Sequence, residues 1–488
     1  MPSIVDYFSS RHGSCGYCKS TDTSQNYSMW AHVITAQDYQ DLIDRGWRRS
    51  GKYCYKPNMK ATCCPLYTIK CDATEFKPSK SQKKLLKRVS KYLMDGKRNE
   101  CPNDSLEDET PVPNDQGFVM TDISSENIQL NLEDIEKVEI LSVIPGEGSI
   151  CTNKLDNDKS SNEQKETEPA DVNTKRTQSL NLEDGKEAGK PKCKKAKLIR
   201  LEKKKQKQSA ASNVNVKTKG NQEKSLEDFI IYENPTLQLE LRLVCLEPES
   251  KQFEDTFEES FAVYQKYQTT IHKDTPSQCN KKQFRRFLVT SPLKREMSVK
   301  GLPCGYGSFH QQYCLNGKII AVGVIDVLPT CISSVYFFYD PDYSFLSLGT
   351  YSSLREIAYV RSLNKTFPQM KYYYMGFYIH NCPKMCYKAR LSPSFLLCPE
   401  SYTWHPVDEA KKKLDMNKYS RLGGTEEEDK NCFKSIHDVL IFCGMGMTYE
   451  YYKSKTGINK DREIEEYGQL VGSKCAKRML LYQSSESD

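Results

Sequence analysis

The sequence lacks any apolar run long enough to cross a membrane, since the longest, Lys318–Leu328, contains an aspartate and is too short. Its first residues also lack the basic stretch followed by apolar residues that is typical of an export signal. We therefore expect a protein of a reducing compartment that has no membrane partner. In such a compartment the 20 cysteines are expected to be free thiols or metal ligands instead of disulfides.

Aromatic residues are nearly absent between about 101 and 224, and this scarcity divides the 488-residue chain. The segment is dominated by Asp, Glu, Asn, Ser and Lys, so it cannot bury enough apolar surface to offset its ordering entropy. We predict a cysteine-rich domain over 1–100, a disordered charged linker over 101–224, and a larger domain over 225–488. The basic run Lys190–Lys207 in the linker has three interpretations: a nuclear import signal, a nonspecific RNA contact or a solvated helix.

Four cysteines near the N-terminus have the spacing of a metal site. Cys15 and Cys18 are two residues apart in a tight turn, and Cys63 and Cys64 are adjacent. A turn can place the first two thiolates on one soft metal ion, and a second pair closes a tetrahedral shell. The sequence therefore predicts a metal that joins the N-terminal loop to a following strand and stabilises a domain with a small core.

A basic amphipathic helix is predicted from Ser81 to Met94. Its apolar side chains recur at helical spacing, and the remaining positions are crowded with cations. One interpretation is a solvated helix face, and the other is contact with nucleic-acid phosphates. The candidate phosphate-binding residues are Lys83, Lys84, Lys87 and Arg88.

The order of predicted elements in the second domain indicates an α+β fold. Asn316-Gly317 separates two strand-like runs, which is the strongest short-range signal for a hairpin. A third strand is predicted over Ser333–Tyr339, a helix begins near Thr350, and another strand spans Lys371–Ile379. Three antiparallel strands, a helix and a further strand form the core order of the GNAT acyltransferase fold, so by fold-level analogy we expect a GNAT-like domain.

Glycine is scarce where an acetyl-CoA enzyme of that fold needs it. Acetyl-CoA enzymes use a glycine-rich loop whose amides surround a pyrophosphate at the start of the helix. The equivalent loop here, Leu346–Thr350, contains Gly349 as its one glycine. We therefore expect an acyl donor other than acetyl-CoA.

Several longer segments make the resemblance specific. The sequence is similar to the eukaryotic arginyl-tRNA–protein transferases over roughly 1–95 and 225–482. The similarity is carried by CGYCK, MWAH, DYQDLIDRGWRRSGKY, TCCP, CGYGSFHQQY, GKIIAVGVIDVLP, SSVYFFYDPDYSFLSLGTYS, LREIA and YYYMGFYIHNCPKMCYK.

The resemblance implies an enzyme that takes arginine from arginyl-tRNA and joins it to the N-terminal α-amine of proteins beginning with Asp, Glu or oxidised Cys. The added arginine marks those proteins for ubiquitin-dependent degradation, the N-degron pathway. It also implies an iron–sulfur cluster on Cys15, Cys18, Cys63 and Cys64, although zinc would satisfy the same four thiolates. We expect a monomer of the cytoplasm and nucleus.

The expected reaction needs groups that align an amine, move protons and stabilise an oxyanion. Asp326 ends a long strand, where it is a candidate for holding or deprotonating the amine or, alternatively, a turn former. His310 and Gln312 share one face of the paired strand, and His310 is interpreted either as a proton shuttle or as a structural histidine. Ser347 begins a helix, which suits the scissile carbonyl or the terminal adenosine.

Substrate-binding candidates follow the last predicted strand. Lys384 and Lys388 are candidates for the acceptor's acidic side chain, with a solvated loop as the alternative. Tyr374 is a candidate for stacking on tRNA bases, and Gly349 lies in the loop that meets the donor. The donor's arginine side chain should meet a carboxylate or an aromatic face, and the choice stays open among Asp340, Asp342 and Glu356.

Two other functions compete with aminoacyl transfer. A CoA-dependent acetyltransferase is disfavoured by the missing glycine-rich loop. A metal-stabilised RNA-binding adapter without catalysis is compatible with the basic helix, but that function does not explain the acyltransferase-like domain.

Overall fold

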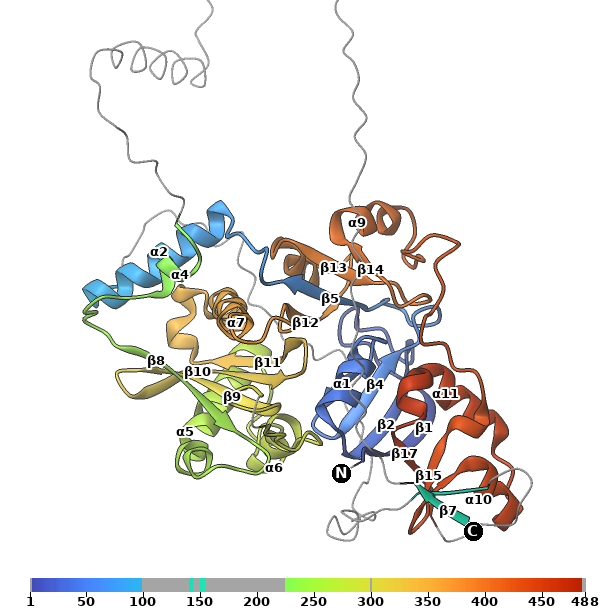
Figure 1. Cartoon of the computed structure of the whole chain (residues 1–488). Coiled ribbons are helices and arrows are strands. Elements are labelled where there is room, and N and C mark those ends of the chain that lie inside the picture. Colours follow the sequence, from blue (N-terminus) through green and yellow to red (C-terminus); the bar gives the residue numbers. More distant parts are fainter. Residues whose placement is uncertain (1, 99–139, 144–149, 154–223, 299–300, 485–488) are drawn as a thin grey trace, which may run out of the picture. The chain divides into compact units, whose positions relative to one another are not determined.

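The computed structural model describes residues 2–98, 140–143, 150–153, 224–298 and 301–484. These residues belong to one compact unit that contains segments from both ends of the chain (Figure 1). Most of the predicted linker over 101–224, including its basic run Lys190–Lys207, lies outside the described residues. None of the described helices is both long and apolar enough to cross a bilayer.

The larger sheet of the described part has nine strands in the order β3-β4-β2-β1-β17-β15-β16-β6-β7. Segments from the two ends of the chain meet in this sheet, where β1 runs parallel to β17. Helices α1 (Ala36–Ile43), α10 (Tyr449–Thr456) and α11 (Asp461–Ala476) pack with it. The strands are β1 (Ile4–Gly13), β2 (Ser24–Val33), β3 (Arg48–Ser50), β4 (Tyr53–Pro57), β6 (Ile140–Val143), β7 (Ile150–Asn153), β15 (Leu440–Phe442), β16 (Gly446–Thr448) and β17 (Leu480–Tyr482).

The second described sheet has eight strands in the order β14-β13-β5-β12-β11-β10-β9-β8. Strands β11 and β12 are parallel, and the other neighbouring pairs are antiparallel. The predicted hairpin is confirmed as β9–β10, with Asn316 and Gly317 at φ 49° and 84° in its turn. The strands are β5 (Tyr67–Asp72), β8 (Leu239–Cys245), β9 (Gly307–Leu315), β10 (Lys318–Val327), β11 (Cys331–Tyr339), β12 (Tyr372–Tyr378), β13 (Ser394–Leu397) and β14 (Trp404–Pro406).

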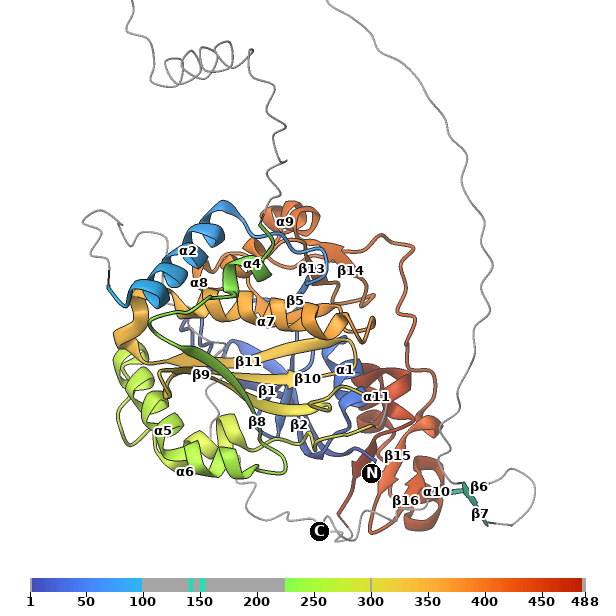
Figure 2. The ribbon, with the colours of Figure 1, turned by 60° about the vertical axis from the view of Figure 1, so that its left-hand side comes forward.

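Helices cover both faces of the eight-stranded sheet. One face carries α7 (Leu348–Asn364), and the opposite face carries α5 (Lys251–Tyr267) with the short α6 (Lys281–Phe284) (Figure 2). Helix α2 (Lys80–Asp95) and α4 (Glu227–Ile230) lie on the α7 side, whereas α8 (Pro383–Cys386) follows β12 and α9 (Val407–Met416) follows β14. The predicted basic helix is confirmed as α2, which begins with a capping box between Ser79 and Gln82.

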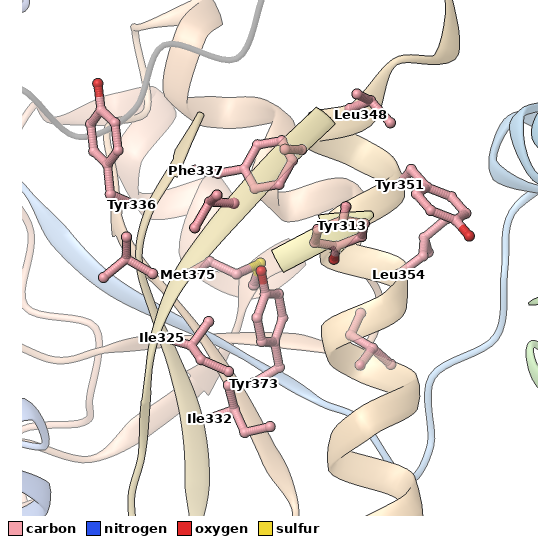
Figure 3. Close-up of a cluster of buried hydrophobic side chains, with 14 of the residues drawn as sticks. Tyr313, Ile325, Ile332, Tyr336, Phe337, Leu348, Tyr351, Leu354, Tyr373 and Met375 are labelled. Atoms are coloured by element: carbon pink, nitrogen blue, oxygen red, sulfur yellow. The ribbon is translucent and has the colours of Figure 1, made fainter. Parts of the chain in front are cut away.

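The core under α7 is built from large aromatic and aliphatic side chains. Figure 3 shows Tyr351 and Leu354 of α7 beside Tyr313, Tyr373 and Met375 of the strands. These five side chains are at most 5% exposed. Burying a large apolar side chain contributes about 1.5–3 kcal/mol, so this layer fixes α7 firmly against the sheet.

The two ordered segments of the chain are joined through both sheets. Strand β5, from the first segment, lies between β12 and β13 of the second, and β17 from the second lies beside β1 of the first. The expected α+β class is confirmed, since the structure combines helices with two sheets of mixed parallel and antiparallel strands. The GNAT-like identity and the boundaries 1–100 and 225–488 stay predictions.

Candidate active site and metal site

The four predicted metal ligands come together. The Sγ atoms of Cys15, Cys18, Cys63 and Cys64 all lie within 4.8 Å of one another, and those of Cys18 and Cys63 are 3.6 Å apart. A tetrahedral ion with metal–sulfur bonds of about 2.3 Å needs sulfurs about 3.8 Å apart. The backbone N–H of Cys63 donates to the carbonyl of Thr23, which holds the two cysteine pairs side by side. The cluster can therefore hold a metal ion.

The thiols of this cluster differ in how easily they ionise. The Ser20 hydroxyl, 2.9 Å from the Cys18 sulfur, is the main reason that the pKa of Cys18 is lowered to about 6. Burial raises the pKa of Cys15 and of Cys64 above the ordinary range. A bound cation would offset that cost, because metal ligation requires deprotonated thiols.

The cysteine loop packs against the end of β12. Tyr17 and Cys64 contact a small apolar cluster made by Leu66, Phe377, Ile379 and Met385. A metal at the cysteines would therefore rigidify the wall of the eight-stranded sheet at β12 and α8.

The two parallel strands of that sheet separate along their length. They pair over Cys331–Ser333 and Tyr372–Tyr374, and no pairing continues although both strands run on. Within the β10–β11 pairing, Val324 is opposite Tyr336 and Ile325 is opposite Ser334, so Val335 is an additional, bulged residue. The bulge lies where the strands part. We call this stretch, in which β11 and β12 run on without pairing, the notch.

The start of α7 brings together two predicted groups of residues. Ser347 precedes α7 in a left-handed conformation, with φ 52°, and accepts a 2.6 Å hydrogen bond from the Arg88 guanidinium of α2. Lys84 and Lys87 are exposed on the same basic helix, and Lys83 is half-buried. The candidate phosphate-binding helix therefore lies beside the loop of Ser347 and Gly349, although the two are about 260 residues apart in sequence.

The predicted acceptor-binding residues occupy different environments. Lys384 is exposed on α8, whereas Lys388 is buried and donates to the carbonyl of Phe377 at 2.8 Å. Tyr374 is 1% exposed and donates to Asp44 at 2.5 Å. Lys388 and Tyr374 thus hold the strands in place, and Lys384 faces solvent. Their binding roles stay predictions.

Asp326 is fully engaged inside the protein. Its carboxylate accepts hydrogen bonds from Arg49 at 2.5 and 2.8 Å and from Ser308 at 2.6 Å, and it is 0% exposed. Burial opposes the charge of Arg49, but the Asp326 carboxylate raises the pKa of that guanidinium above its ordinary value. This geometry favours a structural joint between β3 and β10. The role of Asp326 toward the amine stays a prediction.

His310 and Gln312 do share one face of β9, as predicted, and that face meets α5. His310 is 0% exposed, its Nε2 lies 3.0 Å from the carbonyl of Leu288, and burial lowers its pKa to about 4. Gln312 donates to Thr256 of α5 at 2.8 Å. His310 is therefore neutral at neutral pH, and its surroundings favour the structural interpretation over proton shuttling.

Comparison with known proteins agrees with this arrangement. Residues 13–84 match the family "Arginine-tRNA-protein transferase, N terminus", and residues 259–398 match "Arginine-tRNA-protein transferase, C terminus". The chain is 43% identical over 486 residues to arginyl-tRNA–protein transferase 1 of Drosophila melanogaster, covering 98% of this chain and 99% of that protein. The chain belongs to the arginyl-tRNA–protein transferase family. It is an aminoacyltransferase.

Other relatives of this transferase match over different lengths. Arginyl-tRNA–protein transferase 2 of Arabidopsis thaliana is 34% identical, over 86% of this chain and 78% of that protein. A bacterial aspartate/glutamate leucyltransferase, from Shewanella amazonensis, is 31% identical over 152 residues, which are 31% of this chain and 56% of that protein.

The sequence named Glu356 only as one of three candidates for the donor's arginine side chain, and that role stays a prediction. Glu356 of α7 is 0% exposed, burial raises its pKa to about 7, and neither of its oxygens accepts a hydrogen bond of ordinary geometry from a described residue. The hydroxyls of Tyr373 and Ser334 lie close enough to moderate that rise. Ser334 borders the bulge of β11, so Glu356 lies behind the notch. Its position among Leu354, Ile357 and Ala358, on the apolar face of a helix, was the available signal.

Proposed function

We propose that this transferase moves arginine from arginyl-tRNA to the N-terminal α-amine of proteins beginning with Asp, Glu or oxidised Cys. The observation that carries the proposal is the match along almost the whole chain to a relative named for arginyl-tRNA. The bacterial relative named for aspartate and glutamate supports acidic acceptors. Arginylation would then mark the acceptor for ubiquitin-dependent degradation.

In this proposal the acceptor end of the tRNA binds at α2 and at the start of α7. The exposed cations of α2 attract the acceptor stem, and Arg88 links that helix to Ser347. The first amides of α7 point out of the helix end, where they favour developing negative charge. The aminoacyl ester thus lies in the notch, with its carbonyl toward Ser347 and Gly349.

The transfer needs no covalent enzyme intermediate, because the ester on the ribose is already activated. The attacking α-amine has an ordinary pKa of about 7.7–8, so a useful fraction is neutral near pH 7.5. Alignment of amine and ester is then the main contribution of the protein. Asp326 acts here as a positioning residue that joins β3 to β10, because its oxygens already accept hydrogen bonds from Arg49 and Ser308. His310 and Gln312 hold β9 against α5.

The metal at the four cysteines has a structural role in this proposal. Bound there, it would supply charge compensation and rigidity to the loop that packs on β12. One tetrahedral ion fits sulfurs within 4.8 Å of each other. A cluster that uses a separate iron for each thiolate requires the sulfurs to lie farther apart. Metal analysis with visible absorbance after anaerobic purification distinguishes zinc from iron–sulfur.

Transfer of radiolabelled arginine tests the proposed function directly. Purified protein is incubated with arginyl-tRNA and with peptides that differ only in their first residue, Asp or Gly. We expect the label on the Asp peptide, and its loss when the α-amine of that peptide is acetylated beforehand.

Two controls separate the competing functions. The tRNA charged with lysine in place of arginine should give little transfer, and acetyl-CoA should give none. Equal labelling of the Asp and Gly peptides would refute the proposed acceptor specificity. Binding of tRNA without any transfer would favour an RNA-binding adapter.

A further inference from the structure

A pocket lies on the side of β5 that faces the first sheet. Its lining includes the apolar side chains of Met59 and Leu66 and polar groups from four parts of the chain. The polar residues are Arg45, which follows α1, Lys56 of β4, Thr68 of β5 and Tyr402, which precedes β14.

Lys56 is a buried cation without a carboxylate partner. It is 8% exposed, and its amine donates to the carbonyl of Arg45 and, at 2.9 Å, to the Tyr402 hydroxyl. It forms no ion pair with any described carboxylate. Burial, and then the charge of Arg45, hold the pKa of Lys56 well below its ordinary value. An ammonium has three donors, so one remains for a further acceptor.

Arg45 is itself a cation, and the carboxylate beside it, that of Asp429, is already paired with its guanidinium. Its guanidinium is 2.8 Å from Asp429 and lies 4.0 Å from the centre of the Tyr402 ring. Lys56 contacts the same ring at 4.4 Å. Tyr402 adopts φ 53°, a left-handed conformation that a bulky residue rarely takes. The pocket lining thus includes two cations beside a strained aromatic residue, and Asp429, which pairs with Arg45, is not part of that lining.

Thr68 gives an independent indication of a ligand. Thr68 is 2% exposed and lines the pocket, and its hydroxyl oxygen has no hydrogen-bond partner among the described residues. A buried hydroxyl without a partner costs free energy. A carboxylate accepts hydrogen bonds only, so it matches both Lys56 and Thr68.

The pocket is one strand away from the notch. Thr68 is the register partner of Phe377 on β12, in the part of β12 that has separated from β11. Strand β12 separates the notch from β5, and neighbouring strands lie about 4.8 Å apart. A chain terminus whose amine lies at the β12 edge of the notch therefore directs its first side chain toward the pocket.

We propose that the pocket of Lys56, Thr68 and Tyr402 binds the side-chain carboxylate of the acceptor protein's first residue. The proposal rests on the proposed function, because it concerns the acceptor of arginine transfer. Lys56 and Thr68 donate to the carboxylate, Arg45 adds positive charge, and Met59 and Leu66 contact the methylene groups. Lys56 is the specificity-determining residue in place of the exposed Lys384.

The variant Lys56→Met tests the assignment, because it keeps the length of the side chain and removes its amine. Arginine transfer is measured with peptides beginning with Asp or with Asn, its neutral isostere. For the Asp peptide we expect KM to rise about tenfold or more, with kcat changed less than about threefold. The preference for Asp over Asn should collapse. Thr68→Val, which removes only the hydroxyl, should raise KM for the Asp peptide by a few fold.

Lys60→Met is the matched control. Lys60 is a nearby cation whose side chain is 69% exposed and which lies 3.3 Å from Glu400, outside the pocket lining. This variant should keep the wild-type KM and the wild-type preference. Thermal unfolding of each variant confirms that the fold is retained, and Thr68→Val provides the decisive measurement if Lys56→Met does not fold.

A folded Lys56→Met or Thr68→Val variant with wild-type KM and wild-type preference would overturn the proposal. So would loss of the preference in Lys384→Met while Lys56→Met keeps it. Equilibrium binding of an Asp peptide, labelled with fluorescein at its far end, is measured without tRNA. That measurement tests the pocket even if the wild-type protein transfers no arginine, which would refute the proposed function alone.

Discussion

Two regions of this transferase bury charged side chains in different ways. At the joint of β3 and β10, Arg49 and Asp326 neutralise each other, and Ser308 completes the hydrogen bonds. In the pocket beside β5, the part of the chain that the structure describes offers no carboxylate partner to Lys56 and no hydrogen-bond partner to Thr68. A charge that is satisfied within the chain maintains the architecture. A buried polar group without such a partner favours an external ligand. The cysteine cluster belongs to this second kind, because its four thiols can be shared by one metal ion.

The largest expected effect comes from removing two ligands of that cluster. Cys15→Ser combined with Cys18→Ser should abolish metal binding and lower the melting temperature strongly, because structural metal sites can contribute on the order of 10 kcal/mol to folding. Metal content by mass spectrometry and calorimetric unfolding check both effects. Cys432→Ser is the control, since that thiol is exposed and outside the cluster. Unchanged metal content would show that the ion is not held by these cysteines.

A smaller but still severe effect is expected at the internally satisfied joint. Arg49→Met should lower the free energy of unfolding by about 3–5 kcal/mol, because it leaves Asp326 as an unpaired buried charge. Adding Asp326→Asn to that variant should restore much of the loss, as measured by urea unfolding.

An exposed ion pair provides the matched reference for that cycle. Lys281, whose side chain is 54% exposed, lies 2.6 Å from Glu258, which is 71% exposed, and Lys281→Met should cost less than about 1 kcal/mol. If the effects of Arg49→Met and Asp326→Asn simply add, the two residues do not form the coupled joint that the geometry describes.

Glu356 is expected to give the smallest effect and one that depends on pH. Its pKa is raised to about 7 in the folded protein, from an ordinary value of about 4.5, so the folded state holds a proton that the unfolded state releases. The contribution of Glu356 to stability is therefore present below about pH 4.5 and is lost as the pH rises through 7. Glu356→Gln should remove this dependence and stabilise the protein by up to about 3 kcal/mol at pH 8.

Chemical unfolding at pH 5, 6.5 and 8 measures that difference. The stability of the variant relative to wild type should increase steadily along the series. A constant difference across the three pH values would mean that Glu356 does not titrate in this range and that a partner satisfies its carboxylate.

The sequence alone predicted the features that depend on neighbours along the chain. Thr35 caps α1 and accepts a hydrogen bond from the backbone N–H of Asp38, three residues further along, which is a spacing that can be read from the sequence. The Asn316-Gly317 turn sets the β9–β10 hairpin, and the amphipathic pattern after Ser81 gives α2. The paired spacing of the cysteines predicted their convergence. In each case the signal lies in local backbone preferences or in short repeats, so no knowledge of the fold was needed.

Tertiary structure alone decided where these pieces meet. It placed β5 in the second sheet, Arg88 beside Ser347, Arg49 against Asp326, and Lys56 beside Thr68. Strand partners far apart in sequence and the burial of single charges leave no periodic signal, because they depend on which surfaces the whole chain brings together. A carboxylate at a strand end therefore looked like a base in the sequence, and the fold surrounded it with an arginine and a serine.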